Sequence, residues 1–220
     1  MADVTYTDPH MPATTARTYH HGDLNMALRL AAADLIAERG AGGFSLREVA
    51  RRAGVSHAAP AHHFGDAQGL LTAVAVDAFT HLHATTAAAF DAHDDAVDRL
   101  CAVGRAYVEL AVKHPGHCAI IFRHDLIDAD SEAYTQAGDK AFGVLIASLE
   151  ATAEQINPDL DIQLAATTCW SAMQGLIELH GTMRKLDEHH DDGGSRQIPI
   201  GDLAEQVTRT IVDGFRPAPQ

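Results

Sequence analysis

The sequence predicts an all-α protein with an N-terminal three-helix helix-turn-helix domain and a larger C-terminal helical bundle, about nine helices in total. Apolar residues recur at three- and four-residue spacing through most of the chain, which is typical of amphipathic helices. Hydrophobic residues make up 46% of the 220 residues, and many of them are alanine, the strongest helix former. No run of alternating β-branched or aromatic residues lies between turn signals, so we expect no sheet.

The first predicted helix runs from about residue 23 to residue 39. Asp23 is a candidate N-cap, because its carboxylate can accept a hydrogen bond from the first free backbone N–H groups. Gly40 ends the helix, since a residue just past a helix end often needs a positive φ. The apolar face between them is formed by Leu24, Leu28, Ala31, Ala32, Leu35 and Ile36.

Two short helices follow around a tight turn. Ser45 and Glu48 form a capping box before a short helix whose inward-facing residues are Leu46, Val49 and Ala50. Gly54 then turns the chain, and Ser56 is a candidate N-cap for a third helix that ends near Phe64. This spacing matches the helix-turn-helix motif that reads DNA.

These residues resemble a known family. The segment from Ser45 to Phe64, followed by Asp66, and the entry phrase from Tyr19 to Leu24 are similar to the DNA-binding domain of tetracycline-repressor-like (TetR) transcriptional regulators. The resemblance implies a flexible arm over 1–18, a DNA-binding domain over 19–66 with its motif at 45–64, and a ligand-binding and dimerisation domain over 67–216. It predicts a homodimeric repressor that an unknown small-molecule effector releases from double-stranded operator DNA.

The resemblance also assigns the residues that contact DNA. Arg17 would reach a phosphate or the minor groove, Ser45 would hold a phosphate, and Arg47 would reach the backbone or a base edge. The third helix would enter the major groove, where the candidate contacts are Ser56, His57, Ala58, Pro60, His62 and His63. The alternative is that Arg47 and its arginine neighbours form only a solvated helix face.

Two positions depart from the family pattern. Ala61 stands where the family usually carries a tyrosine, and Ala67 where it usually carries a lysine. Both family residues typically hold phosphates, and each lost phosphate contact weakens binding and its salt dependence. The alternative function is therefore a ligand- or metal-binding helical protein of the same fold that has lost DNA binding.

The charge is unevenly distributed along the chain. The net charge is −14, from 16 basic and 30 acidic residues. Residues 1–70 hold six basic and seven acidic residues, which leaves ten basic and 23 acidic for the remainder. An acidic C-terminal part lowers non-specific affinity for DNA without preventing specific binding by the first domain.

From residue 66 onward we expect a bundle of long helices, with helical spans over 66–91, 96–114, 131–155, 159–186 and 200–215, a short helix near 120–122, and a polar loop over 187–199. His114-Pro115-Gly116-His117, Trp170, Gln174 and Gly175 resemble in part a TetR subgroup named for a Trp–His–Gly pattern. Gln174 stands where that subgroup has its histidine.

By the same family analogy, this bundle holds an effector pocket and a dimer interface. The predicted pocket residues are apolar or mixed groups on converging helices, namely Phe79, His83, Tyr107, Phe122, Phe142, Trp170, Met173 and Gln174. The predicted interface residues lie on the last two long helices and are Leu164, Thr168, Ala172, Leu176, Leu179, Leu203, Val207 and Ile211. The alternative for both sets is an ordinary intramolecular core.

Other function classes find little support in the sequence. No nucleophile elbow, phosphate-binding glycine loop or paired carboxylate occurs, so we expect no enzyme and no cofactor. The 15 histidines show no convincing ligand spacing, so we expect no metal site. Three widely spaced cysteines indicate reduced core thiols. Without a signal peptide or an apolar stretch of roughly 18 residues, a cytoplasmic protein is expected.

Overall fold

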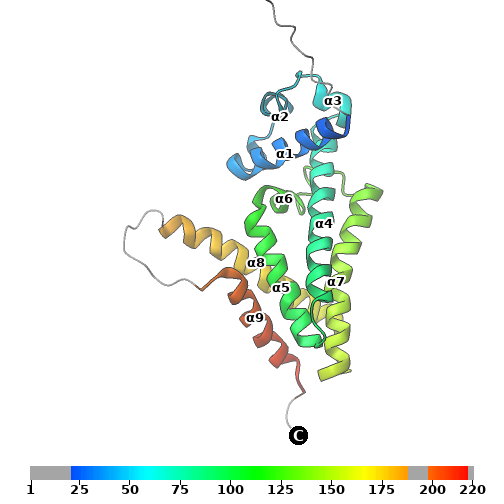
Figure 1. Cartoon of the computed structure of the whole chain (residues 1–220), viewed down its shortest axis with the longest axis vertical. Coiled ribbons are helices and arrows are strands. Elements are labelled where there is room, and N and C mark those ends of the chain that lie inside the picture. The colour runs from blue at the N-terminus through cyan, green and yellow to red at the C-terminus, as the bar shows by residue number, and fades with distance from the viewer. Residues whose placement is uncertain (1–20, 188–197, 218–220) are drawn as a thin grey trace, which may run out of the picture.

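The computed structural model describes residues 21–187 and 198–217, and every regular element in these ranges is helical. Figure 1 shows α1–α3 at one end of the molecule, with α4 running from them into a bundle of the remaining helices. The helices are α1 His21–Arg39, α2 Leu46–Ala53, α3 Ala59–Phe64, α4 Ala67–Asp91, α5 Ala96–Lys113, α6 Pro115–Ile120, α7 Glu132–Ile156, α8 Ile162–Asp187 and α9 Ile200–Phe215. The all-α prediction is confirmed.

Local capping chemistry sets the starts of α2, α4 and α5. Ser45 caps α2 by accepting a hydrogen bond from the Glu48 backbone N–H at 3.2 Å, as the capping box predicts. Asp66 caps α4 and Asp95 caps α5 in the same manner. Gly54 ends α2 with a φ of 69°, in the left-handed region that favours glycine.

Four predicted starts are wrong. α1 begins at His21, before the predicted Asp23. α3 begins at Ala59, and its N-cap position is occupied by Ala58 without any side-chain hydrogen bond, so Ser56 does not cap it. The chain from Ser56 to Ala58 forms a turn instead, in which the Ala59 N–H donates to the Ser56 carbonyl oxygen at 3.0 Å. α8 begins at Ile162 rather than Asp159. The short helix predicted near 120–122 is α6, which begins at Pro115 and ends at Ile120, because proline is tolerated in the first turn of a helix.

One hydrophobic cluster joins the helix-turn-helix to the bundle. It contains fully buried residues of α1, α2, α4 and α6, among them Leu28, Val49, Leu70 and Ile120. The cluster crosses the predicted domain boundary at residue 66, because α4 and α6 both contribute to it. The two parts of the chain therefore share a core, and displacing α6 must disturb the packing of α1.

α6 lies directly against α1 (Figure 1), and Gly116 makes this approach possible. A Cβ atom at position 116 would lie 1.9 Å from the carbonyl oxygen of Ala33 and 3.0 Å from the backbone nitrogen of Ala37. Those distances are far below van der Waals contact, so only glycine fits here without displacing a helix backbone.

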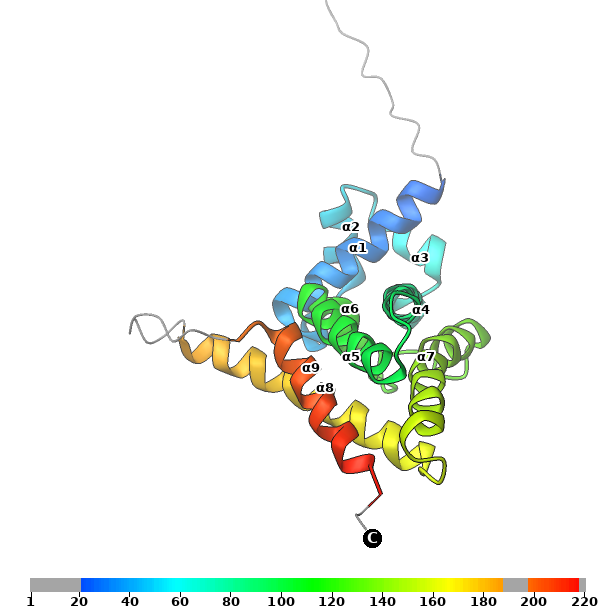
Figure 2. The same cartoon turned by 60° about the horizontal axis from the view of Figure 1, so that its bottom comes forward.

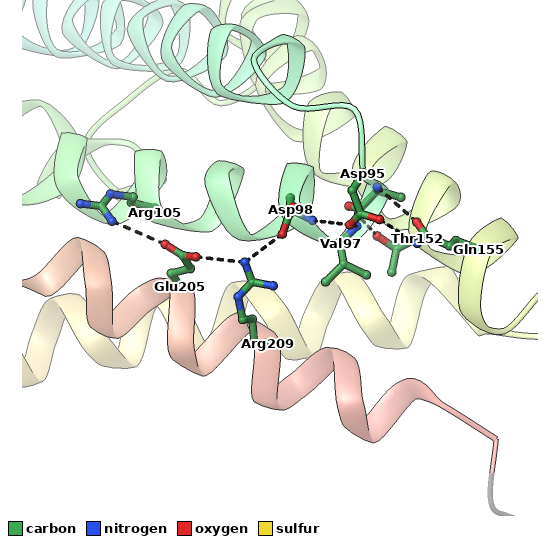
Figure 3. Close-up of polar contacts among 9 residues, drawn as sticks. Asp95, Val97, Asp98, Arg105, Thr152, Gln155, Glu205 and Arg209 are labelled. Carbon is green, nitrogen blue, oxygen red and sulfur yellow. Dashed lines mark hydrogen bonds and ion pairs between the residues drawn. The ribbon is translucent and has the colours of Figure 1, made fainter.

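Helices α8 and α9 close the far side of the bundle, where they cross each other (Figure 2). α9 is held on α5 by a row of ion pairs (Figure 3): Arg209 lies 2.8 Å from Asp98 and 3.1 Å from Glu205, and Glu205 lies 3.5 Å from Arg105. Arg105 also lies 2.7 Å from Asp202 of α9. The Asp95 carboxylate that caps α5 also accepts a hydrogen bond from Gln155 of α7 at 2.8 Å. Polar contacts thus fix three bundle helices relative to one another.

Candidate functional sites

Two regions of the structure have the character of binding sites. The first is the surface of α2 and α3, where Arg47 is exposed and forms no ion pair with any residue that the structure describes. Ser45, the N-cap residue two positions before Arg47, is also exposed. Its hydroxyl oxygen accepts the capping hydrogen bond, which leaves the O–H hydrogen available to a phosphate.

The neighbouring arginines are engaged by acidic side chains. Arg51 makes a two-bonded contact with Glu48, at 2.9 and 2.7 Å, and this contact lowers the pKa of Glu48 to about 2. Arg52 is paired in the same way with Glu38 of α1. Of the three arginines of α2, Arg47 is therefore the one whose guanidinium has no acidic partner in the described structure.

Most of the candidate DNA-contacting residues before and within α3 are exposed. Ser56, His57 and Ala58 are exposed in the turn that precedes α3, and His62 is exposed on the helix itself. His63 is half-buried and packs edge-on against the His62 ring, with ring centroids 5.5 Å apart. Position 61 is exposed and position 67 is partly exposed, both as alanine.

One predicted DNA contact is wrong. Pro60 is buried, so it cannot reach a base. Its ring occupies the first turn of α3, where the missing N–H costs nothing and the apolar ring gains by facing inward. Arg17 lies outside the described residues.

The second region is a cavity of about 330 Å³ inside the helical bundle. Its volume is at the lower end of the range of about 300–1,000 Å³ that small-molecule pockets occupy. Six of the eight predicted pocket residues line it: Phe79, Tyr107, Phe122, Phe142, Trp170 and Met173. The rings of Phe122 and Phe142 lie 5.2 and 6.1 Å from that of Trp170, so α7, α8 and the turn after α6 supply one aromatic wall.

A short chain of hydrogen bonds fixes the polar part of this wall. The Tyr107 hydroxyl donates to Gln174 Oε1 at 2.6 Å and accepts from Trp170 Nε1 at 3.3 Å. Burial raises the pKa of Tyr107 to about 12, so its hydroxyl stays protonated at neutral pH. The network orients the indole ring of Trp170 toward the cavity.

The other two predicted pocket residues do not line the cavity. The Nδ1 atom of His83 lies 3.1 Å from the carbonyl oxygen of Lys140, which holds the ring between α4 and α7. Gln174 stands behind Tyr107 as its hydrogen-bond acceptor. The residues that the sequence analysis missed include Asp139, Thr86, Cys169 and Thr208. No sequence signal distinguishes Asp139 from the many other exposed acids.

The predicted dimer residues fall into two groups. Leu164 and Leu179 of α8 are 65% and 58% exposed, and Thr168 between them is also exposed. They share one face of α8 at helical spacing, together with the exposed Ser171 and Gly175. The remaining predicted residues, Ala172, Leu176, Leu203, Val207 and Ile211, are partly buried in their own chain.

Three histidines gather where α4, α5 and α6 meet. The ring centroids of His81, His114 and His117 lie 6.0–6.3 Å apart. Burial lowers the pKa of His117 and of His114. Within residues 21–187 and 198–217, no group of three His, Cys, Asp or Glu side chains has the geometry of a metal site. The described helices also include none long and apolar enough to cross a membrane.

Two family models match the chain. Residues 28–74 match the model of bacterial regulatory proteins of the tetR family, and residues 100–196 match that of the tetracyclin repressor-like C-terminal domain. Neither description mentions the Trp–His–Gly pattern, so that subgroup stays a prediction. A search of curated proteins gave no match.

Solved structures share the fold over most of the chain. A Rhodococcus sp. RHA1 protein of unknown function is 28% identical, with a TM-score of 0.73, and the match covers 91% of this chain and 100% of that one. The TetR family regulator PfmR from Thermus thermophilus is 20% identical, with a TM-score of 0.67 and coverage of 86% and 99%. The fatty acid degradation regulator FadR from Bacillus halodurans is 15% identical, with a TM-score of 0.70 and coverage of 90% and 100%.

Proposed function

The chain belongs to the TetR family of ligand-responsive, DNA-binding transcriptional regulators, and we propose that it acts in the cytoplasm as a homodimeric repressor rather than as an enzyme. A small molecule in the bundle cavity would release it from its operator. The observation that carries this proposal is that one short segment joins a preformed aromatic cavity to the helix-turn-helix. This segment consists of α6 and Phe122, which lies just beyond it.

The segment that includes α6 touches both sites. Phe122, just beyond α6, lines the cavity, whereas Gly116 in α6 packs on the backbone of α1. A molecule that enters the cavity and displaces Phe122 would therefore move α6 against α1. Because Gly116 already touches the α1 backbone, no free space between the two helices can absorb this motion. A ligand shifts the protein toward the DNA-free state only if it binds that state more tightly.

The proposed dimer is built on the exposed face of α8. A two-fold interface formed by Leu164, Thr168 and Leu179 would bury two large side chains that are otherwise in water, and the small residues between them permit close approach of the partner helix. In a homodimer, the two helix-turn-helix motifs would read successive major grooves about 34–36 Å apart.

The dimer is tested by a charge placed in this face. Leu164→Asp with Leu179→Asp should convert a dimer into a monomer in sedimentation equilibrium, because neither residue supports the core of its own chain. Glu150→Gln with Glu154→Gln, at exposed positions of α7, is the control and should leave the dimer intact. A double aspartate variant that stays dimeric would contradict this interface.

On the DNA side, we propose that Arg47, Ser45, His57 and His62 supply the main contacts, with Ser56, Ala58 and His63 beside them and Arg17 reaching from the arm. Arg47 has the largest role for two reasons. It is the unpaired cation of α2 in the described structure, and the two residues that usually hold phosphates are replaced by Ala61 and Ala67. The exposure of the α2 and α3 residues supports their role.

The experiment is a fluorescence anisotropy titration of the duplex upstream of the coding region, at low and moderate salt. We expect specific binding that weakens with salt, and Arg47→Ala should lower the slope of log K against log salt by about one. Arg216→Ala, which removes one exposed arginine at the far end of the chain, is the charge-matched control. Absence of specific binding even at low salt would contradict the proposed function.

A further inference from the structure

We propose that the cavity selects a compact lipophilic cation, such as an alicyclic or aromatic amine, and discriminates against carboxylates of the same shape. This inference rests on the proposed function of the cavity as the effector site. It follows from the hydrogen-bonding character of the cavity wall, from its aromatic surface and from the one ionised side chain at its edge.

The wall accepts hydrogen bonds but has almost none to donate. The Thr86 hydroxyl donates to the Leu82 carbonyl oxygen at 2.7 Å, and the Thr208 hydroxyl donates to that of Ala204 at 2.9 Å. The hydroxyl of Tyr107 and the indole N–H of Trp170 are likewise donated within the protein. The polar atoms of the wall therefore face a ligand mainly as acceptors, which suit a ligand that carries N–H groups.

Cys169 is the remaining uncharged polar side chain of the wall, and its thiol supplies no strong donor. Burial raises the pKa of its thiol to about 11, so the thiol stays protonated at neutral pH. An S–H group is a weak donor. A buried carboxylate without strong donors or cations around it pays a large desolvation cost.

The charges around the cavity favour a positive ligand. Among the described residues, no Lys, Arg or His lines the cavity, and its single charged lining residue is Asp139 of α7. Asp139 is solvent-exposed, which places its carboxylate at the edge of the cavity rather than in its interior. The nearest basic residue along the chain, Lys140, is exposed and absent from the lining.

The aromatic wall and the overall charge act in the same direction. Phe122, Phe142 and Trp170 stand together on one side of the cavity, and the faces of such rings attract cations. The whole chain carries a net charge of −14, which raises the local concentration of cations near its surface. Each feature penalises an anion and favours an ammonium group on an apolar body.

The test uses three probes of one shape: 1-adamantylammonium, 1-adamantanol and 1-adamantanecarboxylate. They are optically transparent, and Trp170 is the single tryptophan of the chain, so its fluorescence reports occupation of the cavity. With the full-length protein at pH 7.5, we expect the ammonium probe to bind at least about tenfold more tightly than the carboxylate, with the alcohol between them.

A matched pair of variants tests the role of Asp139. Asp139→Asn should weaken the ammonium probe by about two- to fivefold, the range of an exposed ion pair, and leave the alcohol unchanged. Glu150→Gln removes an equal charge from an exposed position of the same helix outside the cavity, and should alter neither affinity. This control separates the local contact from the general field of the protein.

Two results would overturn the inference. Carboxylate binding as tight as ammonium binding would show that the wall does not select charge. No response of Trp170 fluorescence or titration calorimetry to any probe would show that the cavity does not admit a compact cation. Either result, together with specific operator binding by the same preparation, would leave the DNA-binding function standing and remove only the assignment of ligand class.

Discussion

The segment from Gly116 to Phe122 is tightly packed at its first residue and borders a cavity at its last. At Gly116 the chain touches the α1 backbone so closely that a single Cβ would overlap the Ala33 carbonyl oxygen. At Phe122, six residues later, the side chain is 41% exposed and borders a cavity of about 330 Å³. A segment that is fixed to the DNA-reading part at one end and faces empty space at the other is suited to carry a displacement from the cavity to α1.

The largest expected effect on stability comes from disturbing the contact between Gly116 and α1. Gly116→Ala should lower the free energy of unfolding by about 1–3 kcal/mol or more, because the new methyl group forces α6 away from α1. Gly143→Ala is the control: a Cβ there meets nothing within 4 Å, so this helical glycine should tolerate alanine or gain up to about 1 kcal/mol. Urea denaturation of both variants measures the contrast, and a Gly116→Ala protein as stable as the wild type would disprove the close contact.

A smaller effect on stability is expected in the wall of the cavity. Tyr107→Phe removes the hydroxyl that joins Gln174 and Trp170, which should cost about 1 kcal/mol in unfolding free energy. The same change frees the Trp170 N–H toward the cavity, so the affinity for 1-adamantanecarboxylate should rise relative to that for the ammonium probe. An unchanged ratio of the two affinities would argue against the donor-poor character of the wall.

The stability of the contact between α6 and α1 should also depend on pH. Burial lowers the pKa of His117 and His114 in the folded protein, so the unfolded chain takes up protons first as the pH falls. The free energy of unfolding is therefore at its full value above about pH 6.5, the ordinary pKa of histidine. It declines as the pH falls below that value. The charged or titratable groups around this cluster are Arg29, Asp34, Asp77, His81 and Lys113.

His117→Gln tests this dependence. The variant should lose less stability than the wild type between pH 7.5 and 5.5 in urea denaturation, since a group that resists protonation has been removed. His57→Gln, at an exposed position of the helix-turn-helix, should retain the wild-type dependence. Equal pH profiles for wild type and His117→Gln would place the acid sensitivity elsewhere.

The smallest effect on stability is expected at Phe122. Phe122→Ala truncates a partly exposed ring and should cost about 1 kcal/mol or less in unfolding free energy. It should leave operator affinity close to the wild-type value and reduce the response of that affinity to a bound ligand. Anisotropy titrations with and without 1-adamantylammonium separate the two quantities. A full ligand response in this variant would exclude Phe122 from the coupling.

The contrast between the two ends also explains what the sequence could predict. The caps at Ser45, Asp66 and Asp95 follow from side chains that bond backbone groups within three residues, so local sequence is sufficient to find them. Six of the eight predicted pocket residues line the cavity, because large aromatic and apolar side chains from several segments converge in the core of any bundle of this kind.

The remaining features depend on tertiary neighbours. The burial of Pro60 depends on how α3 packs on the rest of its domain. Gly116 reads as a simple helix breaker after Pro115, and only the position of α1 shows that its missing side chain is required. His83 and Gln174 lie on the expected helices, but their direction is set by Lys140 and Tyr107, which are distant in sequence.

One titration tests directly whether the cavity and the helix-turn-helix are coupled. The wild-type protein is titrated onto the operator duplex with and without saturating 1-adamantylammonium, at fixed salt. We predict specific binding that the probe weakens by about tenfold or more, a usual size for allosteric coupling. Specific binding of equal strength in both titrations, with the probe shown by Trp170 fluorescence to occupy the cavity, would contradict the account.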